Sequence, residues 1–263
     1  MADASYSQSL ERGLAILQAF KPGRPVLGIS ELARALDLNR STAHRYVSTL
    51  NRLGYLRQDE DTRKYRLGPR VLDLGFSAIN SMELREIAAP HLRELSDESG
   101  HTVNMAILDG EDIVYVERVR SARAGQREID LNLHVGSRLP AYCTSMGKVL
   151  LANLPAADRT ALLDHIQLTP RGPNTLTARD ALDAELGRVR GTGFAVNNEE
   201  LAYGLRSIAA PVRSAGGDVV AAINLAVHRS MVSMDDLLAR LSPALCRTAT
   251  EISAHAGHRS TPR

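Results

Sequence analysis

Hydrogen-bond donors and short polar side chains gather in one ten-residue stretch of the chain; they are Arg40, Ser41, Thr42, His44, Arg45 and Thr49. At the start of a helix, such groups reach base edges and phosphates in the major groove of DNA. Three further cations follow nearby, at Arg63, Lys64 and Arg66. The spacing predicts a DNA-binding surface, with the first group on operator bases and the second on flanking phosphates or the minor groove.

Residues 30–53 have the pattern of a helix pair that would position the first group. Ser30 is expected to cap the first helix, whose apolar face consists of Leu32, Ala33 and Leu36. Residues 37–39 form a tight corner, and Ser41 is expected to cap the second helix. Three apolar residues spaced three apart should dock that helix inward, and they are Val47, Leu50 and Leu53.

A short hairpin would position the three later cations. Gly54 ends the second helix, residues 55–57 and 64–67 alternate as strands, and residues 59–63 form a charged tip. The alternative is a small helical domain whose charges only face water. The hairpin favours DNA binding, because helix pair and wing together make a winged helix-turn-helix.

Two more helices flank this motif. Residues 7–20 are predicted to form an amphipathic helix that packs on the pair through Leu10, Leu14, Leu17 and Ile16. Pro69 starts a second helix over residues 70–81, which is rich in apolar side chains. We expect a linker helix that contributes to dimer contacts, since DNA half-sites are usually read by symmetric pairs. The alternative is a helix buried within its own subunit.

Composition describes an ordinary globular protein of 263 residues, 44% hydrophobic and 24% charged, with a net charge of only +2. The charge is uneven, because residues 1–68 contain eleven Lys and Arg against seven Asp and Glu. Two cysteines argue against a disulfide framework. With neither a signal-peptide pattern nor an apolar stretch of about 20 residues, the expected location is cytoplasmic, without membrane contact.

From residue 83 the pattern changes to mixed helices and strands. Helices are predicted over residues 83–99, 145–153, 156–165, 179–192 and 233–256. Strands are predicted over residues 102–108, 112–119, 128–133, 194–197, 207–213 and 219–226. The fold class is therefore α+β. The expected domains are a winged helix-turn-helix over 1–68, a linker helix over 69–82, an α+β domain over 83–256 and a disordered tail over 257–263.

Three motifs of the second domain stand in a characteristic order. They are AYCTSMGKVLLA (141–152), GFAVNNEELAYGLRSIAAPV (193–212) and VVAAINLAVH (219–228). Together with the preceding winged helix and linker helix, they resemble the IclR family of bacterial transcriptional regulators over essentially the whole chain. A narrower likeness in residues 65–92, 108–119 and 135–152 resembles the branch that controls the β-ketoadipate pathway and the breakdown of protocatechuate or 4-hydroxybenzoate.

The resemblance implies a GAF-like effector-binding domain, a small carboxylate effector (protocatechuate, 4-hydroxybenzoate or β-ketoadipate), and assembly into dimers or tetramers. The pocket residues that it implies are Leu131, Leu139, Ser145, Met146, Asn197, Leu205, Ser207, Asn224 and Ala226. Asn197 and Asn198 stand where many relatives have acidic residues. Asn224 and Ala226 stand where some members that bind small acids have serines, and these departures weaken any transfer of the ligand from the glyoxylate-type members.

Several polar residues of this domain admit two interpretations. The backbone N–H groups at residues 143–147 would point at a bound anion, or they would only be capped, with Gly147 needed for packing. Asn197, Glu199 and Asn224 would bond to a ligand or to neighbouring backbone. Arg138 and Arg206 would hold a carboxylate or, more commonly, form ion pairs. Tyr142 and Tyr203 would stack on an aromatic ligand or pack in the core.

Enzymatic and metal-binding functions find little support. Cys143, His134 and Glu199 are the types of a nucleophile, a base and an orienting acid, but their spacing guarantees no shared geometry. The sequence has no phosphate loop, dinucleotide fingerprint or zinc-site spacing, so no cofactor and no metal are expected. The prediction is a ligand-responsive transcription regulator, with a ligand-independent DNA-binding protein as the alternative.

Overall fold

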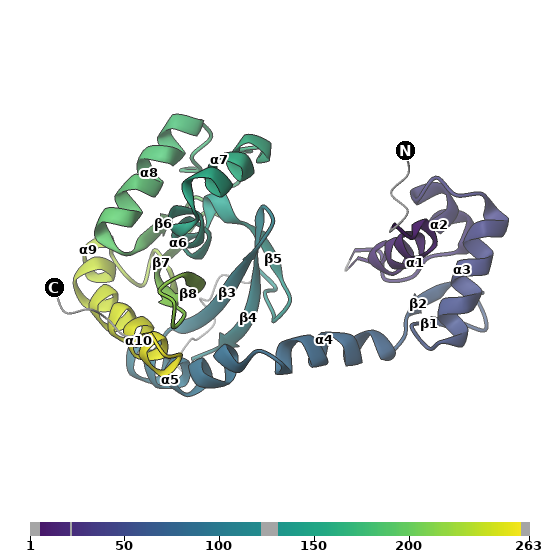
Figure 1. Ribbon diagram of the computed structural model, residues 1–263, viewed down its shortest axis with the longest axis horizontal. Helices are drawn as coiled ribbons and strands as arrows, with labels where there is room; N and C mark the ends of the chain where they lie inside the picture. The colour runs from purple at the N-terminus through teal and green to yellow at the C-terminus, as the bar shows by residue number, and fades with distance from the viewer. Residues whose placement is uncertain (1–5, 22, 122–130, 259–263) are drawn as a thin grey trace. The chain divides into compact units, whose positions relative to one another are not determined.

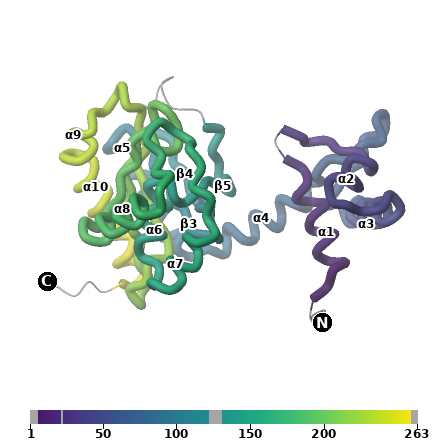
Figure 2. Tube along the Cα trace, turned by 90° about the horizontal axis from the view of Figure 1, so that it is seen from above, coloured from purple at the N-terminus to yellow at the C-terminus, as the bar shows by residue number. Residues whose placement is uncertain are grey.

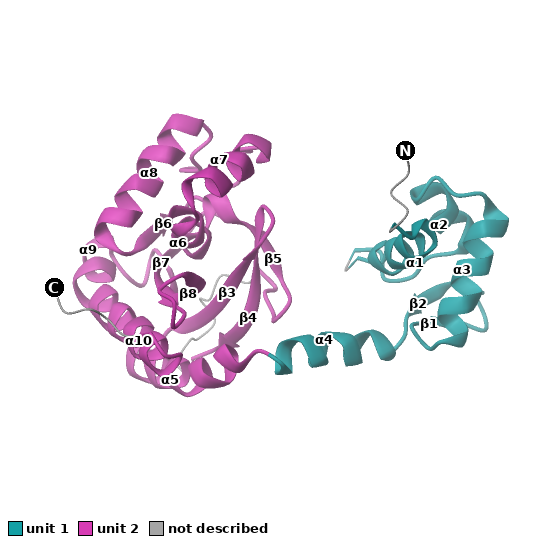
Figure 3. Cartoon of the chain, in the orientation of Figure 1, with its two compact units in different colours: residues 1–81 teal, residues 82–263 magenta. Residues whose placement is uncertain are grey.

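The structure, a computed structural model, describes residues 6–21, 23–121 and 131–258 (Figure 1). The chain divides into two compact units, Met1–Ser81 and Met82–Arg263 (Figure 3). Each unit has its own hydrophobic core.

The first unit contains the predicted helix-turn-helix and its hairpin. Its elements are α1 (Gln8–Gln18), α2 (Ile29–Ala35), α3 (Arg40–Arg52), β1 (Leu56–Gln58), β2 (Tyr65–Leu67) and α4 (Arg70–Asn80). The strands β1 and β2 are antiparallel, with Arg57 opposite Arg66. A small core, which includes Ile16, Leu32, Val47, Leu56 and Tyr65, holds the helices to the hairpin.

Both expected helix caps of this unit are wrong by two residues. α2 begins at Ile29, and its N-cap residue is Gly28 rather than Ser30. The Glu31 carboxylate accepts a hydrogen bond from the Gly28 N–H at 2.8 Å. α3 is capped by Asn39, whose side-chain oxygen accepts from the Thr42 N–H at 2.7 Å and from the Ser41 hydroxyl at 2.8 Å. In α3 the Asn39 side chain satisfies an N–H group of the first turn, whereas in α2 the Glu31 side chain satisfies the N–H of the N-cap residue itself.

Three leucines that were expected to point inward are exposed instead. In α1 the buried residue is Ile16, and a turn of 100° per residue places Leu10 and Leu14 on other sides of the helix, 64% and 49% exposed. Leu53 follows the last residue of α3 and so leaves the helical face that buries Val47; it is 47% exposed.

The last helix of the unit, α4, buries none of its residues. Leu72, Leu74 and Phe76 each leave more than half of their surface exposed. The other elements of the first unit therefore do not bury α4.

The second unit is built on one antiparallel sheet with the strand order β5-β4-β3-β8-β7-β6. Its strands are β3 (Thr102–Asp109), β4 (Asp112–Val119), β5 (Arg138–Pro140), β6 (Ala195–Asn198), β7 (Leu205–Arg213) and β8 (Val219–His228). Its helices are α5 (Glu83–Ser99), η1 (Ala141–Cys143), α6 (Ser145–Asn153), α7 (Ala156–His165), α8 (Arg179–Thr192), α9 (Met234–Asp236), η2 (Leu237–Leu241) and α10 (Ser242–His255).

Helices cover both faces of this sheet. On one face α5 and α10 pack on side chains such as Val103, Met105 and Ile223. On the other face α6 and α8 pack on Ala106, Ala209 and similar small residues. Seen from above in Figure 2, α6, α7 and α8 lie nearest the viewer, on the side away from α5 and α10 in Figure 1.

Two predictions for this unit need correction. Residues 131–133 of the predicted strand 128–133 are not in a strand, and 128–130 lie outside the described residues. The strand beside β4 at that edge of the sheet is instead β5, with Leu139 opposite Ile113. The predicted helix 233–256 is divided, because η2 is a π-helical turn between α9 and α10. Most of the predicted tail, residues 259–263, lies outside the described residues.

The close contact between α6 and η1 generates a prediction for stability. A Cβ on Gly147 would lie 2.1 Å from the Ala141 carbonyl oxygen, which is a backbone atom that cannot swing aside. Gly147→Ala should therefore lower the free energy of unfolding by about 2–3 kcal/mol in urea titrations.

The matched control is Gly187→Ala in α8, where a Cβ would meet only the end of the Arg190 side chain, at 3.9 Å. This change should be neutral or should stabilise by up to about 1 kcal/mol, because alanine favours the helix. Equal effects of the two substitutions would show that α6 does not pack on η1 as described.

Candidate DNA-binding and effector-binding sites

The residues predicted to contact DNA lie mostly on the surface of the first unit. Arg40, Ser41, His44, Arg45 and Thr49 of α3 are exposed, as are Arg63, Lys64 and Arg66 of the hairpin. Thr42 is half-buried, and its N–H donates to the Asn39 cap of α3. A shallow hollow follows the exposed side of α3 and is lined by His44, Arg45, Ser48, Thr49, Arg52 and Leu53.

Local contacts restrain some of these side chains. The Arg45 guanidinium lies 5.8 Å from the centre of the Tyr46 ring, and the Thr49 hydroxyl donates to the Arg45 carbonyl at 2.9 Å. Lys64 lies 3.5 Å from Glu31 of α2. Two contacts hold the pKa of Glu31 below its usual value: the hydrogen bond from the Gly28 N–H, which has the larger effect, and the nearby Lys64 charge. The Arg45 guanidinium is therefore exposed beside the Tyr46 ring, whereas the charge of Lys64 is partly compensated by Glu31.

The second unit contains a cavity on the α6 side of its sheet. Strand alternation places Thr102, Asn104 and Ala106 of β3 on this face, and Val103 and Met105 on the other. The same face is apolar where α6 covers it and polar beyond. The cavity lies over the polar part and is lined by His101, Thr102, Asn104, Tyr115, Arg118, Leu131, Leu133, Thr144, Asn197, Leu201, Leu205, Ser207, Asn224, Ala226, Val227, His228 and Met231.

Six of the nine residues proposed for the effector pocket line this cavity, and they are Leu131, Asn197, Leu205, Ser207, Asn224 and Ala226. The other three do not line it. Ser145 is buried behind Ser207, and the two hydroxyl oxygens lie 2.7 Å apart. Met146 is wholly buried in the core under α6, and Leu139 packs against the same core from β5.

Sequence reasoning missed the part of the cavity wall that β3 and β4 supply. Asn104 pairs in register with Arg118 on one side and Asn224 on the other, so three polar residues from three strands form one row. Alternation within residues 102–106 was the available signal, since it separates Thr102 and Asn104 from the apolar residues between them.

The start of α6 is capped and tightly packed. The Thr144 hydroxyl oxygen accepts from the Gly147 N–H at 3.1 Å. Gly147 itself faces the Ala141 backbone, so its lack of a side chain serves packing rather than close approach of a ligand.

The polar residues with two interpretations bond mostly to the protein. Asn197 donates to the Cys143 carbonyl at 2.7 Å and accepts from the Glu200 N–H at 3.1 Å. Glu199, with a φ of +60°, accepts from the Gly204 N–H at 2.7 Å and pairs with Arg229 at 3.0 Å. These contacts fasten residues 199–204, the loop that carries Leu201 to the cavity.

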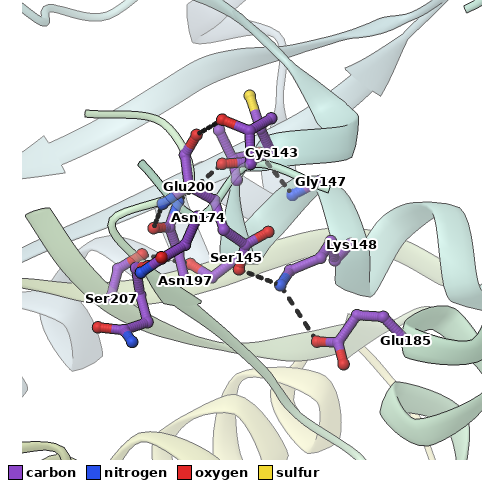
Figure 4. A network of polar contacts seen from close by, with 12 residues as sticks. Cys143, Ser145, Gly147, Lys148, Asn174, Glu185, Asn197, Glu200 and Ser207 are labelled. Carbon is purple, nitrogen blue, oxygen red and sulfur yellow. Dashed lines mark hydrogen bonds and ion pairs between the residues drawn. The ribbon is translucent and has the colours of Figure 1, made fainter. Parts of the chain in front are cut away.

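A buried ion pair lies beside this loop (Figure 4). Lys148 of α6 is 1% exposed, and its ammonium nitrogen lies 2.6 Å from Glu200 Oε1 and 3.1 Å from Glu185 Oε1. Burial raises the pKa of Glu200, and the Lys148 charge opposes that rise. Glu185 also receives two hydrogen bonds from Arg188, both at 2.7 Å. The pair joins α6, α8 and the loop 199–204.

The cavity is not lined by the two arginines and two tyrosines considered as ligand contacts, which are Arg138, Arg206, Tyr142 and Tyr203. Arg138 pairs with Asp109 and Asp112 at the surface, as the commoner interpretation had it. Arg206 forms no ion pair in the described residues and bonds instead to the Asn198 side chain and the Val232 carbonyl. Tyr142 is buried and donates to the Thr169 carbonyl at 2.6 Å. Tyr203 is 69% exposed, beneath the Arg229 guanidinium.

The residue types of a nucleophile, base and acid are not brought together. Burial raises the pKa of Cys143 to about 12, which leaves its thiol protonated and unreactive. The His134 ring bonds to Ser137, and Glu199 bonds to the loop and Arg229. Within residues 6–21, 23–121 and 131–258, no group of three metal-ligating side chains occurs, and no helix is long and apolar enough to span a bilayer.

Comparison with known proteins matches both units to one family. Residues 9–60 match the IclR helix-turn-helix domain, and residues 76–254 match the family described as bacterial transcriptional regulator IclR C-terminal. The Pca regulon regulatory protein of Pseudomonas putida is 38% identical over 250 residues, which cover 95% of this chain and 84% of that protein.

Solved structures agree in fold. An IclR family transcriptional regulator from Brucella abortus is 29% identical, with a TM-score of 0.82 over 97% of this chain and 94% of that one. An IclR homolog from Microbacterium hydrocarbonoxydans, complexed with 4-hydroxybenzoate, is 26% identical, with a TM-score of 0.80 over 95% of this chain and 99% of that one. The matched families and relatives are transcriptional regulators and not enzymes. This chain belongs to the IclR family of bacterial transcriptional regulators.

Proposed function

We propose that this regulator responds to a small aromatic carboxylate and belongs to the control of aromatic-acid breakdown. The observation that carries the proposal is the cavity of the second unit, whose polar row lies among Tyr115, Leu131, Leu201 and other apolar side chains. A concave site that combines apolar walls with a few polar groups suits a ring bearing an acid. The relative named for the Pca regulon and the homolog bound to 4-hydroxybenzoate support this ligand class.

The exposed side of α3 is proposed to read operator DNA. Its donors stand on one helix beside a cationic hairpin, as in other winged helix-turn-helix proteins. Effector binding would change DNA affinity to the extent that the acid binds the two conformations of the protein unequally.

DNA selected by the wild-type protein from a random-sequence pool provides the test. Arg45→Ala should weaken binding about 10- to 100-fold in fluorescence anisotropy, because a base or phosphate contact is lost. Arg247→Ala, at an exposed position of α10, is the control and should bind normally. The same titration with 4-hydroxybenzoate, protocatechuate, β-ketoadipate or pyruvate should show a Kd changed about 5- to 150-fold by at least one aromatic acid.

Other outcomes of this titration are decisive. A response to pyruvate alone would identify a regulator of a different small organic acid. Salt-dependent binding that no acid alters would identify a ligand-independent DNA-binding protein. Normal binding by Arg45→Ala would remove the central residue of the proposed recognition surface.

We also propose that α4 pairs two copies of this chain. Its apolar residues, Val71, Leu72, Leu74, Phe76 and Ile79, form one side of the helix, and Asp73, Ser77 and Asn80 form the other. An exposed apolar side of this kind marks a contact surface. A second copy is the expected occupant, since paired recognition helices match paired half-sites.

Leu72→Glu combined with Phe76→Glu should therefore shift sedimentation velocity profiles from dimer or tetramer toward smaller species, because two carboxylates cannot be buried unpaired. Ser77→Glu, on the polar side of the same helix, should leave the profile unchanged. An unchanged profile for the double variant would place the dimer contacts elsewhere.

A further inference from the structure

The hairpin of the first unit places two arginines directly opposite each other. In the antiparallel pairing of β1 with β2, Arg57 is the partner of Arg66, and both side chains are exposed. Strand alternation puts them on the outer face of the hairpin, because their neighbours Leu56 and Tyr65 are buried on the inner face, 0% and 6% exposed. The Cβ atoms of directly opposed residues lie only about 5 Å apart, so the two positive charges repel each other.

Acidic side chains compensate these charges only in part. Within residues 6–21, 23–121 and 131–258, no ion pair joins either arginine to an acid, and Glu31 of α2 pairs with Lys64 instead. Asp59 accepts from the N–H and the hydroxyl of Thr62, at 2.9 and 2.8 Å. These hydrogen bonds lower the pKa of the Asp59 carboxyl, and the Arg66 charge adds to the lowering. One carboxylate therefore acts at a distance on a pair that carries two charges.

Backbone hydrogen bonds hold the hairpin closed in spite of this repulsion. Tyr65 exchanges two of them with Leu27, at 2.8 and 2.9 Å, and the Gly68 N–H donates to the Tyr55 carbonyl at 2.7 Å. The strands cannot separate without breaking such bonds. An anion bound between the two guanidinium groups would replace their repulsion by attraction on both sides.

We propose that Arg57 and Arg66 together hold one phosphate of the DNA backbone on the outer face of the hairpin. Each guanidinium offers five N–H donors in a planar fork that matches phosphate oxygens. This inference rests on the DNA-binding role proposed for α3, and it adds Arg57, which the sequence pattern did not single out. It also commits the outer face of the hairpin to a phosphate and not to the minor groove.

Fluorescence anisotropy on the full-length protein tests the pair at several salt concentrations, with one duplex selected by wild type and one of unrelated sequence. Arg57→Met combined with Arg66→Met should weaken binding to both duplexes equally, about 10- to 100-fold, because a phosphate contact carries no sequence information. The slope of log Kd against log salt concentration should fall by about 0.9 per bound copy, the value for one phosphate. Stoichiometric titration gives the number of bound copies.

Two comparisons accompany this experiment. Each single variant should lose less affinity than the double variant, because the remaining arginine still contacts the phosphate. Arg247→Met removes the same charge from an exposed position of α10 and should leave both the affinity and the slope unchanged.

Thermal unfolding of the DNA-free protein provides a readout that a structural role would move in the opposite direction. Arg57→Met should leave the Tm unchanged or raise it, because the like-charge contact is removed. A lower Tm together with weaker DNA binding would show that Arg57 supports the hairpin itself, and would overturn the phosphate contact.

The remaining outcomes separate the phosphate contact from the proposed reading of DNA by α3. A slope loss of about 1.8 per bound copy would place the two arginines on separate phosphates, and an unchanged slope would show that water alone surrounds them. A larger loss on the selected duplex than on the unrelated one would show that the pair reads bases. Each of these results overturns the shared contact and leaves the α3 proposal standing. If wild type instead prefers no sequence, the α3 proposal fails, and the slope still decides whether the pair holds a phosphate.

Discussion

The effector-binding unit depends on one buried cation. Lys148 is almost wholly enclosed, and its ammonium joins α6 to Glu185 of α8 and to Glu200 of the loop at the cavity. Glu185 retains Arg188 if Lys148 is removed, but Glu200 forms no second ion pair among the described residues, and its Oε2 is buried without a hydrogen-bond partner there. A buried carboxylate of this kind is tolerated only while its partner is present. The position of the loop 199–204 therefore depends on the buried charge of Lys148.

The sheet face beneath α6 divides into a packed part and an open part. Small apolar residues such as Ala106 and Ala209 let α6 lie close, and Gly147 lets its start approach η1. Beyond α6 the same strands carry Asn104, Asn224 and other polar residues. Strand alternation and the length of α6 therefore decide both where the core ends and where the cavity begins. The polar residues of α3 in the first unit lie instead on an exposed helix face.

Local patterns predicted most of the fold but little of the cavity's internal chemistry. Helical periodicity and turn residues revealed the winged helix-turn-helix, although Asn39 rather than Ser41 caps α3, since neighbouring polar residues compete for the same N–H groups. Asn224 was proposed as a pocket residue, but its partner Asn104 lies 120 positions away, and no pattern within one strand states the register between strands. Lys148 would be taken for a solvated helix residue, because its burial depends on α8 and the loop 199–204.

The Lys148–Glu200 pair holds the loop 199–204 beside the cavity, and its strength can be measured by a double-mutant cycle in urea unfolding. Lys148→Met alone should lower the free energy of unfolding by about 3–5 kcal/mol, because it leaves Glu200 buried and unpaired. Lys148→Met combined with Glu200→Met should recover at least about 2 kcal/mol of that loss, since no buried charge then remains unpaired. If Lys148→Met costs less than about 1 kcal/mol, or if the double variant costs the sum of Lys148→Met and Glu200→Met, the pair does not hold the loop.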